Sequence, residues 1–189
     1  MAVSLSKGGN VSLTKEAPGL TAVTVGLGWD VRTTTGTDFD LDASAIAVNQ
    51  QGKVYSDAHF VFFNNKQTPD NSIVHTGDNR TGEGAGDDEV ILVDLTRIPP
   101  HVSTIVFIVT SYRGHTFEQV KNAFCRLVDT TSNAELARFT LQGGMPFTGM
   151  VMAKVYRVGG EWKLQAIGEG IQAKHAGEAA PQLARFLGV

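Results

Sequence analysis

The sequence predicts a mainly β protein, a two-sheet β-sandwich with one or two peripheral helices, built as a single domain over residues 1–189. Glycine is frequent, at 21 of 189 residues, and this indicates many turns and therefore many strands. Short segments that alternate apolar and polar residues, or are continuously apolar, recur along the chain. The length and a hydrophobic fraction of 42% suffice for a substantial buried core.

Strands dominate the first hundred residues. Segment 21–28 alternates small or polar residues with Val23, Val25 and Leu27, as a strand with one buried face does. Segments 90–94 and 104–110 are continuous apolar runs, which are typical of strands buried on both faces. The strands expected in this part of the chain are 11–13, 21–28, 40–49, 59–63, 90–94 and 104–110.

One helix is predicted over 116–128, because Thr116 and Gln119 form a capping box at its start. An apolar stripe at helical spacing follows the box and consists of Phe117, Val120, Phe124, Leu127 and Val128. Cys125 falls within this helix, and we interpret it as a small helix residue rather than as a nucleophile.

Further strands and a second, short helix are predicted after residue 130. The strands are 134–141, 150–158 and 162–168, and the Gly159-Gly160 pair joins the last two as a hairpin. A C-terminal helix is expected to begin near Pro181 and to bury Leu183, Phe186 and Leu187.

Composition and charge narrow the classes of function. The net charge is −3 and no run of basic residues is present, so no nucleic-acid partner is expected. Cys125 is the single cysteine, which excludes an intrachain disulfide. The N-terminal residues lack the apolar stretch of a signal peptide, and no window reaches membrane-spanning length. We therefore expect a cytoplasmic protein without a membrane span.

The most unusual segment is the acidic, glycine-rich stretch 77–89, which runs directly into the apolar run 90–94. Its carboxylates include Asp78, Asp87, Asp88 and Glu89, and glycines at 82, 84 and 86 allow backbone carbonyls to turn inward. Calcium takes about six to eight hard oxygen ligands of both kinds in flexible geometry. Zinc prefers Cys and His, which the stretch lacks. The segment therefore predicts a calcium site.

Two known loop types do not fit this segment. With Asp78 as the first position, Glu89 falls at the twelfth position of an EF-hand, but Glu83 stands where that loop requires glycine. Glu83 also stands where a phosphate-binding loop requires lysine. The remaining alternative is a solvated turn without a ligand, in which Arg80 alone would be a weak counter-charge for the acids.

A second acidic cluster lies in segment 38–42. Asp38, Asp40 and Asp42 alternate with apolar residues, so on a strand they would share one face. Such a face is either an exposed edge that resists aggregation or a set of ligands for a shared cation. If 21–28 and 40–49 pair as a hairpin, Asp30 lies near Asp38 and joins the cluster.

These segments, in this order, resemble the TerD family of tellurium-resistance and stress-response proteins. The resemblance rests on 3–10 (VSLSKGGN), 26–30 (GLGWD), 40–44 (DLDAS), 77–84 (GDNRTGEG) and 86–89 (GDDE), and it spans nearly the whole chain. It implies a calcium-binding β-sandwich of bacterial tellurite-resistance and chemical-stress systems, with no established catalytic activity.

One or two calcium ions are expected, because so many carboxylates exceed the charge of one ion, and other stress-response proteins are expected as partners in a complex. The implied ligands are the carboxylates of Asp78, Asp87, Asp88, Glu89, Asp40 and Asp42, with carbonyl oxygens from Asn79, Gly82, Gly84 and Gly86. One alternative is a divalent-metal-dependent phosphoesterase that uses the same carboxylates, for which His75 is the histidine to test. A third hypothesis, compatible with calcium binding, is a scaffold in which calcium shapes a surface that faces a protein or a membrane.

Overall fold

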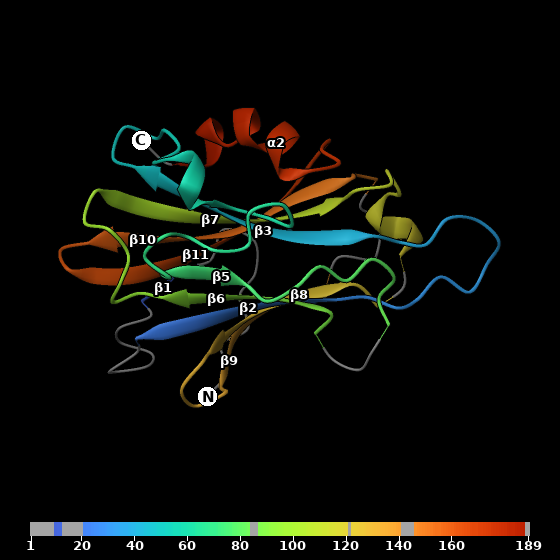
Figure 1. Cartoon of the computed structure of the whole chain (residues 1–189), viewed down its shortest axis with the longest axis horizontal. Helices are drawn as coiled ribbons and strands as arrows, with labels where there is room; N and C mark the ends of the chain where they lie inside the picture. Colours follow the sequence, from blue (N-terminus) through green and yellow to red (C-terminus); the bar gives the residue numbers. More distant parts are fainter. Residues whose placement is uncertain (1–9, 13–20, 84–86, 121, 141–145, 188–189) are drawn as a thin grey trace.

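The computed structural model describes residues 10–12, 21–83, 87–120, 122–140 and 146–187. Two antiparallel sheets stack as two layers (Figure 1), so the predicted two-sheet sandwich is confirmed. Sheet A has the order β1 (Asn10–Ser12), β11 (Glu161–Ile171), β10 (Gly149–Val158), β7 (Val102–Ser111), β3 (Leu41–Asn49), β4 (Phe60–Val61). Sheet B has the order β5 (Ile73–His75), β6 (Glu89–Asp94), β2 (Ala22–Gly28), β8 (Phe124–Asp129), β9 (Glu135–Thr140).

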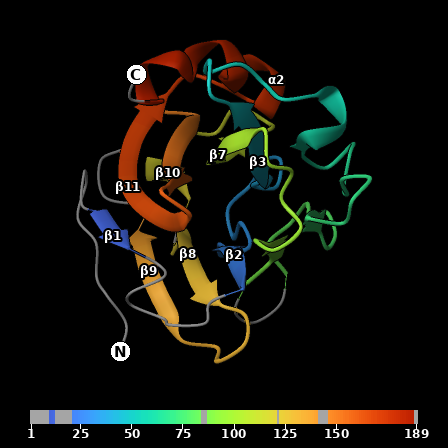
Figure 2. The ribbon, with the colours of Figure 1, turned by 90° about the vertical axis from the view of Figure 1, so that its left-hand side faces the viewer.

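The main core lies between the sheets and follows from the alternation of side chains along each strand. In β2, Val23, Val25 and Leu27 point into this core and are at most 2% exposed. β7 is buried along both faces, as its apolar run predicts, because a second apolar cluster covers its outer face. Ile108 of β7 and Leu183 of the C-terminal segment belong to that cluster. In Figure 2, β7, β10 and β11 accordingly lie between α2 (Ala176–Ala179) and strands β2, β8 and β9.

The predicted helix over 116–128 is wrong. The capping box of Thr116 and Gln119 does form, but it starts only the 3₁₀ turn η2 (Phe117–Gln119). Asn122 then adopts a positive φ of 52°, and the chain continues as strand β8. A different pattern, with a period of two, explains the strand: Ala123, Cys125 and Leu127 face the core, whereas Arg126 between the last two does not.

Three other expectations about strands need correction. Segments 21–28 and 40–49 do not pair as a hairpin, since β2 lies in sheet B between β6 and β8 while β3 lies in sheet A. β6 is buried on one face only, and its Leu92 is 38% exposed. Segment 59–63 contributes just the two-residue β4, preceded by the 3₁₀ turn η1 (Asp57–His59), and the short strand β5 was not predicted.

The C-terminal helix begins earlier than predicted and is broken. It consists of α2, which is followed by the 3₁₀ turns η3 (Ala180–Gln182) and η4 (Ala184–Phe186), with Pro181 inside η3. Leu183 is buried as expected, while Phe186 and Leu187 are only partly buried against the second apolar cluster. Within the described ranges, no helix has the length and apolar character needed to cross a bilayer.

Candidate metal centre

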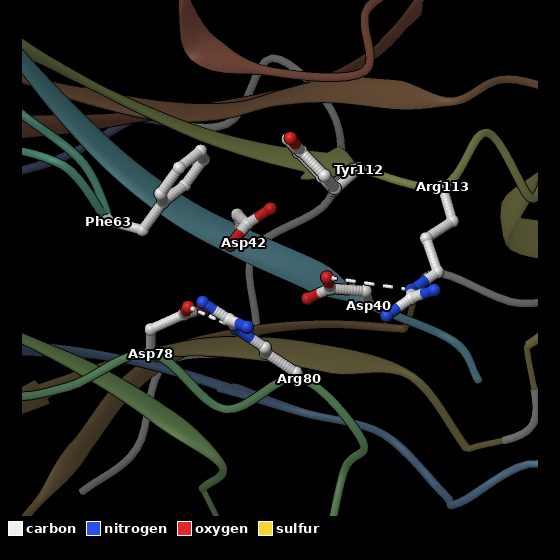
Figure 3. Close-up of a pocket in the computed structure, with 7 residues that line it drawn as sticks. All are labelled: Asp40, Asp42, Phe63, Asp78, Arg80, Tyr112 and Arg113. Atoms are coloured by element: carbon white, nitrogen blue, oxygen red, sulfur yellow. Dashed lines mark hydrogen bonds and ion pairs between the residues drawn. The ribbon is translucent and has the colours of Figure 1, made fainter. Parts of the chain in front are cut away.

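Three carboxylates from two distant segments converge beside the start of β3. Asp40 and Asp42 come from the β3 segment and Asp78 from the acidic loop, and one oxygen of each lies within 4.8 Å of the others. Figure 3 shows the two strand residues facing Asp78 across a pocket. We call Asp40, Asp42 and Asp78 the acidic trio.

Strand pairing explains why the acidic loop reaches β3 at this point. β4 pairs with β3 only at Ala45 and Ile46, so the first residues of β3 have no strand neighbour on that side. There the side chain of Glu89, at the start of β6 where the loop ends, provides a partner: the backbone N–H of Ala43 donates to Oε2 of Glu89 at 2.9 Å. Unpaired backbone groups at a sheet edge need such partners when they are buried.

Glu89 and Asp88 hold the loop in position. The fully buried Glu89 accepts hydrogen bonds from Ala43 N–H and from Asn79 N–H (3.2 Å), and thereby joins the β3 segment to the residue after Asp78. Asp88 Oδ2 accepts the backbone N–H of Trp29 at 2.8 Å. Both acids therefore position the trio from the side of sheet B.

Burial and the repulsion from neighbouring carboxylates disfavour ionisation of Asp40 and Asp42. Burial, together with repulsion from the charges of Glu89 and Asp40, raises the pKa of Asp42 to about 9. Burial also raises the pKa of Asp40 to about 6, where Asp78 adds repulsion and Arg113 opposes the shift. Among the described residues, Asp40 Oδ1 and Asp42 Oδ2 are buried polar atoms without a hydrogen-bond partner. Such atoms call for a cation, a proton or a bound ligand.

The pocket in front of the trio has a volume of about 160 Å³. Two arginines flank it: Arg80 Nε lies 3.1 Å from Asp78 Oδ2, and Arg113 Nε lies 3.9 Å from Asp40 Oδ2. Phe63 and Tyr112 complete the lining, as Figure 3 shows.

The structure places other predicted ligands outside the trio. Asp87 is bound by Arg126, whose Nη2 lies 2.7 Å from Asp87 Oδ2. Asp30 accepts a hydrogen bond from Asn122 Nδ2 at 2.7 Å, and Asp38 is exposed just before β3. β3 itself begins at Leu41, so the predicted acidic strand over 38–42 is largely a loop that leads into it.

The amide and glycine residues of the loop shape the turn. Asn79 Oδ1 accepts the backbone N–H groups of Thr81 and Gly82, which closes the turn after Asp78. Gly82 has a φ of 80°, and a Cβ there would lie 2.5 Å from Trp29 Nε1, so a side chain does not fit. Gly84 and Gly86 lie outside the described residues.

Sequence reasoning missed Arg113, Tyr112 and Phe63 as pocket residues. A signal for Tyr112 exists in strand register: Thr110 of β7 lies opposite Asp42 of β3, and a residue two positions further along faces the same side. That signal requires knowing that β3 and β7 are neighbours. Phe63 and Arg113 carry no comparable sequence pattern.

The layered fold and the acidic trio define a β-sandwich protein with a candidate metal centre. The family model described as the TerD domain matches residues 1–178, and the chain belongs to the TerD family. The Tellurium resistance protein TerD of Serratia marcescens is 48% identical over 191 residues, covering 98% of this chain and 97% of that protein.

Other relatives extend this picture. General stress protein 16U of Bacillus subtilis (strain 168) is 43% identical over 178 residues, covering 91% of this chain and 92% of that protein. A crystal structure of a TerD homologue from Streptomyces coelicolor A3(2) superimposes with a TM-score of 0.77, at 23% identity, and covers 87% of this chain and 98% of that one. The latter likeness supports the fold.

Proposed function

We propose that this chain is a non-enzymatic calcium-binding protein of the bacterial response to tellurite and other chemical stress, and that the acidic trio provides its carboxylate ligands. One observation carries the calcium proposal: buried carboxylate oxygens without partners, on Asp40 and Asp42, converge with Asp78 at a pocket. The part in stress resistance is supported by the names of the relatives, which include tellurium resistance and general stress proteins.

The donor set fits calcium. All three groups offer hard carboxylate oxygens, and neither His nor Cys lines the pocket. Calcium–oxygen distances of about 2.3–2.6 Å allow ligand oxygens on one ion to be almost 5 Å apart, which matches oxygens within 4.8 Å of one another. When bound, the ion would supply the positive charge that lets the buried carboxylates ionise together. Asp88 and Glu89, the predicted ligands next to the trio, already accept backbone N–H groups, so the proposal assigns one ion to the trio.

Calorimetry on chelator-stripped protein tests the proposal, with calcium and magnesium titrated in parallel and thermal melts recorded with each ion. We expect calcium to bind more tightly than magnesium, because a flexible site of carboxylates suits the larger ion. The melting temperature should rise by mass action as calcium saturates the site. No heat and no thermal shift at millimolar calcium would refute the calcium site.

Matched variants locate the site. Asp40→Asn and Asp78→Asn each remove one charged ligand of nearly unchanged shape and should weaken calcium binding at least about tenfold. Asp38→Asn is the control, because Asp38 lies two residues from Asp40 but is exposed and outside the trio. Equal weakening by the control would mean that general negative charge, rather than the trio, attracts the ion.

The phosphoesterase alternative gains no support from His75. Gly77 N–H donates to His75 Nδ1, so Nε2 carries the ring proton and donates to Glu89 at 3.2 Å. The side chain is fully buried, and burial lowers its pKa. His75 is thus held as a neutral structural residue behind the trio. An assay of phosphate release from an aryl phosphate, with and without calcium, tests this alternative directly.

Cytoplasmic location and association with other stress-response proteins are the remaining parts of the proposal. The lone Cys125 is buried and free, as suits a reducing compartment. Cell fractionation tests the location, and co-purification with and without chelator tests whether calcium controls association.

A further inference from the structure

The pocket contains more than a cation site needs. Besides the acidic trio it is lined by two guanidinium groups and by two aromatic rings, those of Phe63 and Tyr112. A site made for a bare cation has no use for arginines, because each one repels the ion. The composition therefore points to a second ligand with its own negative charge and its own apolar surface.

Charge makes anion binding depend on the metal. With all three carboxylates ionised, the three acids and two guanidinium groups give the pocket a formal charge of −1, and one divalent cation changes it to +1. The cation would also compete with Arg80 and Arg113 for Asp78 and Asp40, to which the two guanidiniums now lie close at 3.1 and 3.9 Å. Guanidinium groups released from such pairs bind phosphate or carboxylate groups in bidentate fashion.

The metal itself would leave room for that anion. The trio brings together one oxygen from each of three carboxylates, and calcium takes about six to eight oxygen ligands. The side chain of Arg113 is 41% exposed and that of Arg80 is 74% exposed, so both can reorient without disturbing the core. An oxyanion in the pocket would therefore meet both the open side of the ion and two mobile guanidinium groups.

The two aromatic rings of the pocket indicate that the ligand also has an apolar part. Phe63 and Tyr112 pack edge to face with centroids 5.5 Å apart, and Tyr112 is 50% exposed although it is a large aromatic residue. Phe62 and Phe60 continue this edge-to-face series away from the pocket. A cavity of about 160 Å³ is close to the size that holds a benzene ring in a protein interior.

We propose that the calcium-loaded pocket binds a small aromatic oxyanion, with its phosphate or carboxylate group between the ion, Arg80 and Arg113 and its ring against Tyr112 and Phe63. The proposal rests on the calcium site proposed above and names the ligand class of the same pocket. Calcium would then act as a bridge between the protein's carboxylates and the anion.

Calorimetry with two matched probes tests this inference. Phenylphosphonate carries both features and resists hydrolysis, while methylphosphonate carries the same anion without the ring. We expect phenylphosphonate to bind calcium-loaded protein at least about tenfold more tightly than chelator-stripped protein, and more tightly than methylphosphonate. Equal binding of the two probes overturns the role of the rings, and binding that is independent of calcium overturns the bridge.

Variants separate the ligand from the metal. Arg80→Leu and Arg113→Leu should weaken phenylphosphonate binding about tenfold, yet strengthen calcium binding, because a competing positive charge is lost. Tyr112→Leu should weaken phenylphosphonate binding and leave calcium binding unchanged. Arg97→Leu is the control, since Arg97 is also an exposed arginine paired with an aspartate, Asp94, at 3.3 Å. Unchanged phenylphosphonate affinity in all three pocket variants would overturn the proposal.

The two proposals fail in different ways. Calcium binding without any phenylphosphonate heat overturns this inference and leaves the calcium site intact. Absence of calcium binding overturns both, and is seen already in the first titration.

Discussion

Replacing Asp42 by asparagine is expected to stabilise the metal-free protein while abolishing its response to calcium. Asp42 is 2% exposed, and its pKa in the folded protein is raised from the ordinary value of 3.8 to about 9. At pH 7 the side chain is therefore protonated in the folded metal-free protein and ionised in the unfolded chain. Folding takes up a proton, which costs free energy at neutral pH.

The size of this cost follows from the two pKa values. The 3.2 pH units between 3.8 and pH 7, at about 1.4 kcal/mol each, amount to about 4 kcal/mol as an upper limit. Asparagine has nearly the same shape and no proton to take up, although its amide must also be accommodated. If half of the limit is recovered, about 2 kcal/mol, the melting temperature of a chain of this size rises by about 4–8 °C.

The direction in which the stability of the metal-free protein changes with pH gives a second readout. Because the folded pKa is raised, the penalty is absent below pH 3.8 and grows as pH rises toward 9, so wild-type metal-free protein should lose stability over that window. The Asp42→Asn variant should lose less stability over the same pH window. Calcium at about 100 times its Kd should add about 2.7 kcal/mol to the wild type and almost nothing to the variant.

Thermal melts of chelator-stripped wild type and Asp42→Asn, from pH 5 to 9 and with added calcium, measure all of these effects. A variant that melts lower than wild type at pH 7 without metal would refute the electrostatic argument. If the melting temperature of the variant still rises with calcium as much as that of the wild type, Asp42 is not a ligand of the ion. Asp38→Asn, exposed and outside the trio, serves as the control and should match the wild type in both respects.

Three further predictions concern Glu89, the protons released by calcium, and the buried cysteine. Glu89→Ala removes the acceptor of the Ala43 and Asn79 N–H groups and should destabilise the fold by about 2–4 kcal/mol, measured by denaturant unfolding, whereas the exposed Glu83→Ala should have almost no effect. Calcium binding at pH 7 should release protons, because the pKa of Asp42 is about 9, and the heat of binding should then vary with the ionisation enthalpy of the buffer; a constant heat would contradict this. Cys125 is completely buried and its pKa is strongly raised by burial, so a thiol reagent should modify it only after unfolding, and rapid labelling of native protein would contradict its place in the core.

The sequence predicted the positions of the strands better than it predicted which strands are neighbours in a sheet. Alternation and turn residues identify most strands within a residue or two, as with β10 and the hairpin turn at Gly159 and Gly160. They do not reveal which strands pair: a hairpin of 21–28 with 40–49 is compatible with the sequence, yet β2 and β3 lie in different sheets. Segment 116–128 shows a second limit: a correct capping box and a short apolar stripe suit a helix and a 3₁₀ turn plus strand equally well.

The same limit applies to the site. Acid density identified the two segments that meet in the trio, because so many carboxylates are improbable in a core without a partner. It did not sort their roles, since Asp78 faces the pocket, Asp87 pairs with Arg126, and Glu89 anchors the loop to β3. Roles of this kind depend on which backbone N–H groups lie free at the edge of β3, and that is set by strand pairing far along the chain.

The two arginines explain how the trio persists without a metal. Arg80 and Arg113 place positive charge beside Asp78 and Asp40, and both guanidinium groups are well exposed, so solvent screens each pair and each contributes little to stability. Neither guanidinium reaches the buried oxygens Asp40 Oδ1 and Asp42 Oδ2, which stay without a partner. The pairs are therefore strong enough to reduce repulsion in the empty pocket and weak enough for a divalent cation to displace. A buried lysine in the same place would satisfy the acids permanently and close the site to any ligand.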